Sequence, residues 1–370
     1  MTPGVAADGH VQGRPVGRAA GTGDVWLSAW LLAVALLVVV MVAVGGATRL
    51  TDSGLSITQW KPLLGAIPLL SAADWADAFA RYKAIPEYKL VNAGMSLDAF
   101  KFIYWWEWGH RFLGRCIGLV YAIPLVGFWL AGRIPSRLKV ALAGVLLLGA
   151  LQGFVGWYMV QSGLTERVDV SQYRLAMHLG LAFIILACLV WLALAAWPAD
   201  PLTRLQEVGT PARWLAVALV VLIFCQVVLG AFVAGTKAGL TYNTWPLMDG
   251  DLVPGGMWDM TPWYLNIAEN LTTVQFNHRV MAYLLVATAA LQALIIARQT
   301  DNRAARASAR LLALAMVAQA GLGVWTLLSV DGAIPIGLGI VHQTAAAVVF
   351  AIAVWHLHAV RPGARPWARP

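Results

Sequence analysis

The chain has 370 residues, of which 60% are hydrophobic and 12% are charged, and its mean hydropathy is +0.70. A soluble domain carries about 25% charged residues, so this composition excludes a soluble globular protein. The formal net charge of +8 does not indicate nucleic-acid binding, because the basic residues lie in the short connections between apolar runs.

Apolar runs long enough to cross a hydrocarbon core of roughly 30 Å occur along the whole chain. They cover residues 25–47, 105–131, 138–160, 174–197, 212–235, 271–297, 308–330 and 338–360. The first run is longer than the core of a signal peptide, and no A-x-A pattern follows it, so we expect an uncleaved first span. The sequence therefore predicts an all-α integral membrane protein with eight transmembrane helices.

Basic residues are distributed unevenly between the two sides of these spans. An even number of spans places both termini on one side, and that side carries Arg14, Arg18, Arg133, Arg137, Lys139, Arg204, Arg213, Arg298, Arg303, Arg306, Arg310, Arg361, Arg365 and Arg369. The short and medium connections on the other side contribute Arg167, Arg174 and Lys237. The positive-inside rule therefore predicts that both termini are cytoplasmic.

The chain also contains one internal repeat. The pattern Thr-x-x-Gly-Leu-x-x-x-x-Trp occurs at 51–60 and again at 236–245, and His-Arg opens both the second and the sixth span. We therefore expect two tandem, pseudo-symmetric four-helix bundles, at 25–197 and 212–360, related by an axis along the membrane normal. An N-terminal tail (1–24), a linker (198–211) and a C-terminal tail (361–370) would complete the chain, all cytoplasmic.

Four of the seven histidines occupy equivalent places in this repeat: His110 and His178 in the first unit, and His278 and His342 in the second. A lone membrane histidine is more often a packing residue. Two opposing histidines of a bundle, however, can hold one heme iron by both axial positions. Zinc or non-heme iron would require a local cluster of ligands, which the sequence lacks. Each half therefore predicts a heme site.

One acid accompanies the histidines in one half only. Glu107 lies three residues before His110 and shares its helix face, whereas the repeat places Gln275 before His278. An acid within a membrane is costly and is a functional candidate; the alternative is an interface carboxylate paired with Arg111 or Lys101. The asymmetry favours chemistry in the N-terminal half and a permanent heme in the C-terminal half.

Several other polar residues have more ordinary interpretations. Arg111, Arg115 and Arg279 could pair with heme propionates or anchor the helices at the interface. The repeat gives no partner for His356 and His358, so we assign them a structural role. The three cysteines Cys116, Cys188 and Cys225 lie inside apolar runs, where packing thiols are expected.

The longest motifs resemble those of the heme A synthase family. They are the run GATRLTDSGLSI at 46–57, the run FKFIYWWEWGHR at 100–111, Asn277-His278-Arg279 and His342-Gln343. The resemblance covers essentially all of 25–360. It implies a cell inner-membrane protein that makes heme A for terminal oxidases by oxidising the C8 methyl group of heme O to a formyl group.

The resemblance also implies roles for the histidines and the acid. His278 and His342 would ligate a permanent heme b, His110 and His178 would lie at the substrate-heme site, and Glu107 would be the catalytic acid. Heme O synthase and oxidase assembly factors are the partners to expect, with membrane lipid and possible homo-oligomers but no nucleic acid. Gram-positive members carry a cysteine pair in the first outer loop, and segment 48–104 has no cysteine, which excludes a thiol role there.

Three functional classes remain open on physical grounds alone. They are an oxidoreductase acting on a heme substrate, a di-heme electron-transfer protein of the quinol or ferric reductase type, and a heme carrier for oxidase assembly. The four histidines fit all three classes. Glu107 favours the first class, because a pure electron carrier needs no acid in one half only.

Overall fold

The computed structural model describes residues 24–62, 64–165, 167–198 and 208–362. Nearly all of the predicted tails and most of the predicted linker lie outside these described residues. Helices long and apolar enough to cross a membrane are α1 (Val25–Leu50), α4 (Leu97–Leu130), α5 (Ser136–Leu164), α6 (Gln172–Ala196), α7 (Thr210–Thr236), α8 (Leu271–Gln299), α9 (Arg303–Leu328) and α10 (Ile336–Ala359). These eight helices confirm the predicted fold class.

The first helix begins where a short polar side chain satisfies its free backbone donors. The Asp24 carboxylate accepts hydrogen bonds from the backbone N–H of Trp26 and of Leu27, at 2.9 and 3.1 Å. The guanidinium of Arg133, between α4 and α5, donates to both oxygens of the same carboxylate at 2.7 and 2.8 Å. The Asp24 carboxylate therefore caps α1 and links it to the connection between α4 and α5.

The second transmembrane helix begins earlier than the sequence analysis placed it. Residue 105 was the expected start, but α4 begins at Leu97, after Ser96, whose hydroxyl accepts from the N–H of Ala99 at 3.2 Å. Two short helices that were not predicted, α2 (Ala72–Lys83) and α3 (Pro86–Leu90), precede it, as does η1 (Leu64–Ala66). The first turns of α4 extend because Phe100 and Tyr104 bury their rings against these helices.

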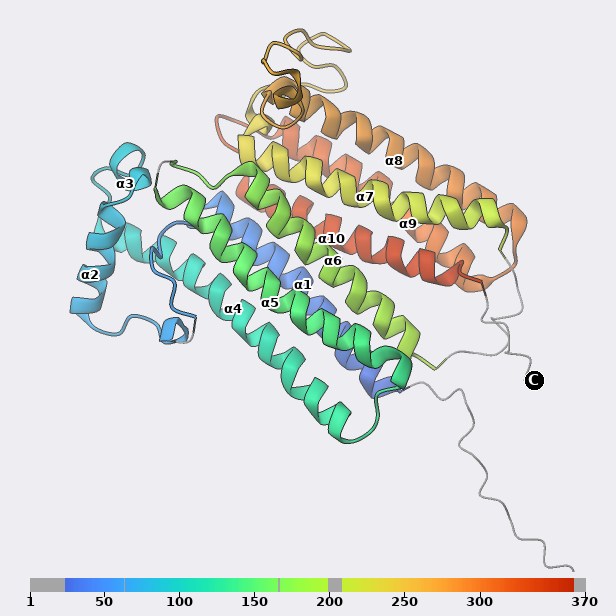
Figure 1. Ribbon diagram of the computed structural model, residues 1–370. Coiled ribbons are helices and arrows are strands. Elements are labelled where there is room, and N and C mark those ends of the chain that lie inside the picture. Colours follow the sequence, from blue (N-terminus) through green and yellow to red (C-terminus); the bar gives the residue numbers. More distant parts are fainter. Residues whose placement is uncertain (1–23, 63, 166, 199–207, 363–370) are drawn as a thin grey trace, which may run out of the picture.

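The transmembrane helices pack as two units of the same plan. In the first, α1 contacts α4 and α6, and α5 contacts α6; in the second, α7 contacts α8 and α10, and α9 contacts α8 and α10. Contacts of α1 with α10 and of α6 with α7 and α10 join the units (Figure 1). A two-fold relation between the units would exchange the α1–α10 contact with the α6–α7 contact. The packing is therefore compatible with the predicted tandem bundles.

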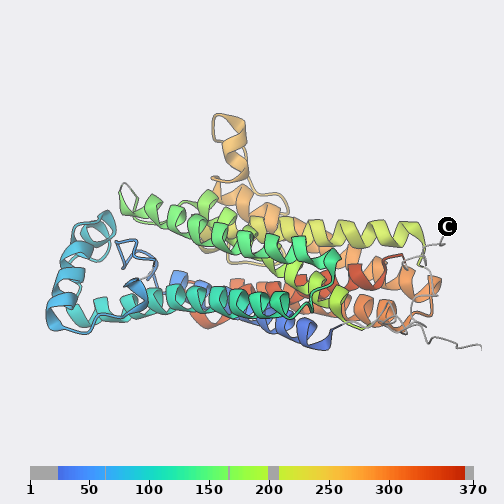
Figure 2. The ribbon, with the colours of Figure 1, turned by 60° about the horizontal axis from the view of Figure 1, so that its bottom comes forward.

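The two longest connections lie at the same end of the helices, which we call the loop end. Segment 51–96, with α2 and α3, covers the start of α4, and segment 237–270, with η3 (Ala238–Leu240) and η4 (Trp263–Ile267), projects sideways near the start of α8 (Figures 1 and 2). The repeated histidines all lie in the parts of their helices nearest this end. The loop end therefore carries the candidate site.

Candidate active site

Each repeated histidine faces a glycine on a neighbouring helix. A Cβ built on that glycine would approach the imidazole Cε1 to 3.0 Å for Gly45 and His110, 2.9 Å for Gly156 and His178, 3.2 Å for Gly230 and His278, and 2.8 Å for Gly323 and His342. Contacts this short leave no room for a methyl group without displacing the ring. The four imidazole rings therefore occupy space that only glycine leaves free at these positions.

The two histidines of each unit come from helices that are not adjacent in the chain but pack against one common helix. His110 on α4 and His178 on α6 lie on helices that both contact α1, and His278 on α8 and His342 on α10 lie on helices that both contact α7. Within the described residues no group of three or more potential metal-ligating side chains forms.

Glutamine amides hold three of the four histidines. The Gln152 amide nitrogen lies 3.1 Å from Nδ1 of His178 and donates to its carbonyl at 3.0 Å. The Gln319 amide does the same to His342, at 3.2 and 2.9 Å. Gln226 on α7 donates to the carbonyl of His278 at 3.0 Å, with its nitrogen 3.3 Å from Nε2 of that ring.

The fourth histidine, His110, has no such glutamine contact among the described residues. The repeat offset between α1 and α7, 236 − 51 = 185 residues, makes Met41 the counterpart of Gln226. A thioether cannot donate the hydrogen bond that the Gln226 amide donates. Nδ1 of His110 is buried without a hydrogen-bond partner among the described residues, so this imidazole has the least constrained polar surroundings of its pair.

Glu107 is buried and fully engaged as an acceptor. The residue is 3% exposed. Its Oε2 accepts from the Ser56 hydroxyl at 2.7 Å and the Ile57 backbone N–H at 2.6 Å, and its Oε1 accepts from Arg111 at 2.5 Å. These three donors fix the orientation of the carboxylate. The pair with Arg111 is one that the alternative interpretation expected, whereas Lys101 pairs with Asp98, and the carboxylate is buried rather than exposed at an interface.

Gln275 occupies the same place in the second unit with reversed hydrogen bonding. Its amide nitrogen donates to the carbonyls of Ala238 and Tyr242, both at 3.1 Å. The loop segment next to Glu107 presents the backbone N–H of Ile57. The loop segment next to Gln275 presents backbone carbonyl oxygens instead. Each loop is therefore shaped for its own side chain, and the two residues are not interchangeable isosteres.

The arginines next to the histidines hold the repeated loop motifs in place. Arg111 donates to the carbonyls of Ile57 and Gln59, at 2.9 and 3.3 Å, and Arg279 donates to those of Tyr242 and Thr244, at 2.8 and 2.9 Å. Arg115 donates to Pro62 and Lys61 in the same way, at 2.8 and 3.1 Å. The three arginines thus anchor the loops to α4 and α8, a role that was not predicted from the sequence.

Two histidines and the cysteines lie apart from this arrangement. His356 is fully buried, with one ring nitrogen 2.8 Å from the Gln292 amide and the other 2.9 Å from the Ser308 hydroxyl. His358 packs its ring edge-on against Trp191. Both positions fit the expected structural role, and Cys116, Cys188 and Cys225 are free and not exposed.

Gly45, Gly230 and Gln226 were not predicted from the sequence. The repeat does match Gln152 and Gly156 to Gln319 and Gly323. The signal was present for Gly45 and Gly230, because 230 − 45 gives the same offset of 185 that relates the two Trp motifs. Gln226 has no counterpart in the first unit, so comparing the halves could only have shown a difference there. Its role follows from its contact with His278.

The fold and the paired histidines define a class: multi-pass α-helical membrane proteins with two similar intramembrane sites. The family model described as Cytochrome oxidase assembly protein (COX15-CtaA) matches residues 28–354. The chain is similar to the heme A synthase of Parvibaculum lavamentivorans, with 52% identity over 86% of this chain and 89% of the relative. It is also similar to the heme A synthases of Agrobacterium fabrum, with 50% identity over 85% of each chain, and of a Chelativorans species, with 48% over 94% of each. The chain belongs to the COX15-CtaA family of cytochrome oxidase assembly proteins.

Proposed function

We propose that this protein is a heme A synthase, an oxidoreductase that oxidises the C8 methyl group of heme O to a formyl group for use in terminal oxidases. The observation that carries this proposal is the buried Glu107 beside the paired His110 and His178. A site of this kind suits a reaction that moves protons next to a bound heme substrate. The similarity to heme A synthases along most of the chain supports it.

In the second unit, His278 and His342 would hold a permanent heme b. The paired imidazoles suit axial ligation, the glycines opposite them leave room for the rings, and Nδ1 of His278 is buried without a partner among the described residues. A bound heme b would supply one-electron redox chemistry. Gln226 and Gln319 would keep the two rings oriented, as supporting hydrogen bonds do for metal ligands.

In the first unit, His110 and His178 would bind heme O. Glu107 would accept or return a proton beside the substrate, and hydrogen bonds from Ser56, Ile57 and Arg111 would fix the orientation of its carboxylate. Buried donors of this kind need no rearrangement when charge develops nearby. Arg115 and Arg279 each keep a buried N–H without a partner among the described residues, and these would meet a heme propionate.

At three positions near His110 and Gln152 the first unit has exposed glycines, whereas the second unit has larger side chains. Gly114 and Gly118 follow His110 at one and two turns on α4, and Gly149 lies one turn before Gln152 on α5. A Cβ on Gly118 or Gly149 would meet nothing within 4 Å, and one on Gly114 would meet only Met41, at 3.5 Å. The repeat places Ala282, Val286 and Met316 there. A substrate that must enter and leave needs such space, and a permanent group does not.

The remaining parts of the proposal concern placement and partners. Both termini would be cytoplasmic in the cell inner membrane, with the loop end facing outward, on the positive-inside argument. Residues 25–197 would form the substrate half and 212–360 the heme b half. Heme O synthase would supply the substrate, oxidase assembly factors would take the product, and homo-oligomers are compatible with this scheme. Reporter fusions at Arg303 and Asp251 should give opposite readouts, and identical readouts would refute the orientation.

Pigment extraction tests the reaction itself. The protein is co-expressed with heme O synthase in a host that makes no heme A, and the extracted hemes are separated by chromatography. Formyl-bearing heme is the expected product. Heme O together with heme b but without any oxidised product would select the electron-transfer or carrier class instead.

A further inference from the structure

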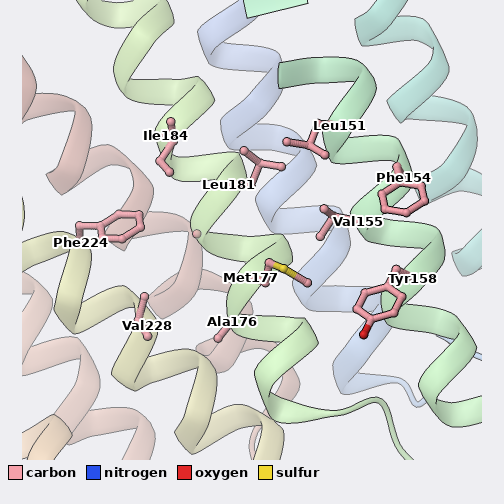
Figure 3. Close-up of a pocket in the computed structure, with 11 residues that line it drawn as sticks. Leu151, Phe154, Val155, Tyr158, Ala176, Met177, Leu181, Ile184, Phe224 and Val228 are labelled. Atoms are coloured by element: carbon pink, nitrogen blue, oxygen red, sulfur yellow. The ribbon is translucent and has the colours of Figure 1, made fainter. Parts of the chain in front are cut away.

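A long apolar groove runs along the surface of the bundle where the first unit meets the second. It has a volume of about 670 Å³ and lies between α5, α6 and α7. Phe154 and Tyr158 line it from α5, Met177 and Ile184 from α6, and Phe224 and Val228 from α7 (Figure 3). The lining residues do not include His178 or its contacts Gln152 and Gly156, so the groove is distinct from the candidate active site.

The length of the groove is close to the thickness of the hydrocarbon layer of one lipid leaflet. It follows α6 from Ala176 to Ile184, which at 1.5 Å per residue is about 12 Å. Half of a hydrocarbon core of roughly 30 Å is about 15 Å. Ala176 lies near the start of α6 and Ile184 in its middle, so the groove extends from the loop end towards the centre of the bilayer.

Arg174 lies two residues before Ala176, the first residue of α6 that lines the groove. The guanidinium of Arg174 stacks on the ring of Tyr158, 3.8 Å from its centroid, and donates to the Tyr158 carbonyl at 2.7 Å. No carboxylate pairs with Arg174 in the part of the chain that the structure describes. The repeat places Leu338 and Trp325 at these two positions in the second unit, so the cation is particular to this face.

We propose that this groove is a binding site for an anionic phospholipid, with an acyl chain along α6 and the phosphate on Arg174. The side chains that line the groove offer the acyl chain of the lipid apolar contacts. A guanidinium that lacks a protein counter-ion beside the end of a leaflet-length groove complements an anionic head group. Such a lipid would fill the joint between the two units.

Photo-crosslinking in nanodiscs tests this proposal on the full-length protein. A diazirine-bearing phosphatidylglycerol is added in small amount to phosphatidylcholine nanodiscs, and a matched phosphatidylcholine probe serves as the reference. Adducts from the anionic probe should concentrate in residues 151–158 and 176–184. Arg174→Gln should reduce them roughly tenfold, whereas Arg167→Gln, a change at an exposed arginine of the neighbouring loop, should not.

A second pair of variants tests the apolar part of the site. Val228→Trp fills the groove and should also reduce the adducts, while Val221→Trp, two turns away on the same face of α7, should not. Equal labelling by the two probes, or labelling unaffected by Arg174→Gln, would overturn the proposal. Displacement of the anionic probe by a neutral isoprenoid alcohol, equally in wild type and Arg174→Gln, would assign the groove to an isoprenoid chain and would overturn it too.

Discussion

The two halves of this protein share one framework and differ in what surrounds it. Both present two histidines, each packed against a glycine, and in both an arginine one residue after the first histidine anchors the loop motif that ends in Trp. The differences lie beside this framework: Glu107 against Gln275, Met41 against Gln226, and Gly118 against Val286. The two units thus share the histidines and glycines that would hold a heme. They differ in the residues that would take part in its chemistry or leave space for its entry.

The strongest test of this comparison separates the two sites by their histidines. His278→Ala and His342→Ala should each abolish or shift the low-spin heme spectrum of the purified protein, because an axial ligand of the permanent heme b is removed. His110→Ala and His178→Ala should keep that spectrum while abolishing heme A formation. Absorption spectra and extracted hemes from the four variants, measured side by side, check this expectation.

The control for these variants is His358→Ala, which should leave the spectrum unchanged. His356 is less suitable, because its fully buried ring contacts Gln292 and Ser308, and its loss would leave those groups unpaired. An unshifted, full-strength spectrum in His278→Ala would remove the heme b assignment from the C-terminal half.

The next largest effect is expected at Glu107. Glu107→Gln removes a titratable group beside His110, so heme A formation should fall by about 10²-fold or more if the carboxylate transfers protons. The amide would also place its NH₂ group against Arg111 or against the donors of the loop. Heme b should be retained, and unconverted heme O should accumulate on the protein, as measured by extraction and chromatography.

Asp98→Asn provides the matched comparison, because Asp98 is an exposed acid on the same helix, paired with Lys101. It should leave the yield of heme A unchanged. Gln275→Glu should destabilise the second unit, since it sets a carboxylate against the carbonyls of Ala238 and Tyr242. Near-normal heme A from Glu107→Gln would reduce Glu107 to a loop anchor and reopen the electron-carrier interpretation.

A smaller effect is expected from filling the space in the first unit. Gly118→Val introduces the side chain that Val286 has in the second unit, and should lower heme A formation by about tenfold without changing heme b content. The Gly127→Val variant alters a glycine that is equally unobstructed but farther along α4 from His110, and should stay active. Equal losses in both variants would mean that α4 is simply sensitive to added volume.

Equivalent offsets in the repeat single out His110, His178, His278 and His342, and their pairing as heme ligands stays a prediction. The sequence was sufficient for the fold, because hydropathy predicts the eight spans that the structure contains. It was insufficient for α2 and α3, whose aromatic side chains pack against α4 rather than forming an apolar run of membrane length. The role of Arg111 depended on where the loop carbonyls lie, which only the folded chain defines, and the burial of Glu107 under Ser56 and Ile57 had the same cause.

The smallest expected effect concerns a buried acid that only the first half possesses. Glu87, in α3, is 5% exposed, and its carboxylate accepts a hydrogen bond from the buried Tyr82 hydroxyl at 3.3 Å. Burial raises the pKa of Glu87 to about 8, against the lowering effect of the Tyr82 hydrogen bond, and the nearby carboxylates of Asp52 and Glu107 add to the rise. The carboxyl is therefore neutral in the folded segment at neutral pH.

Because this pKa is higher in the folded than in the unfolded segment, the stability that the neutral carboxyl provides is complete below the unfolded pKa and is lost as pH rises through about 8. Limited proteolysis of segment 51–96 should accelerate between about pH 6 and about pH 9 beyond the change in protease activity itself. Glu87→Gln should flatten this dependence, whereas Asp77→Asn, at an exposed acid of α2, should not. Cleavage in segment 237–270 of the same molecules provides the internal reference, and a matching acceleration there would mean that the pH response does not come from Glu87.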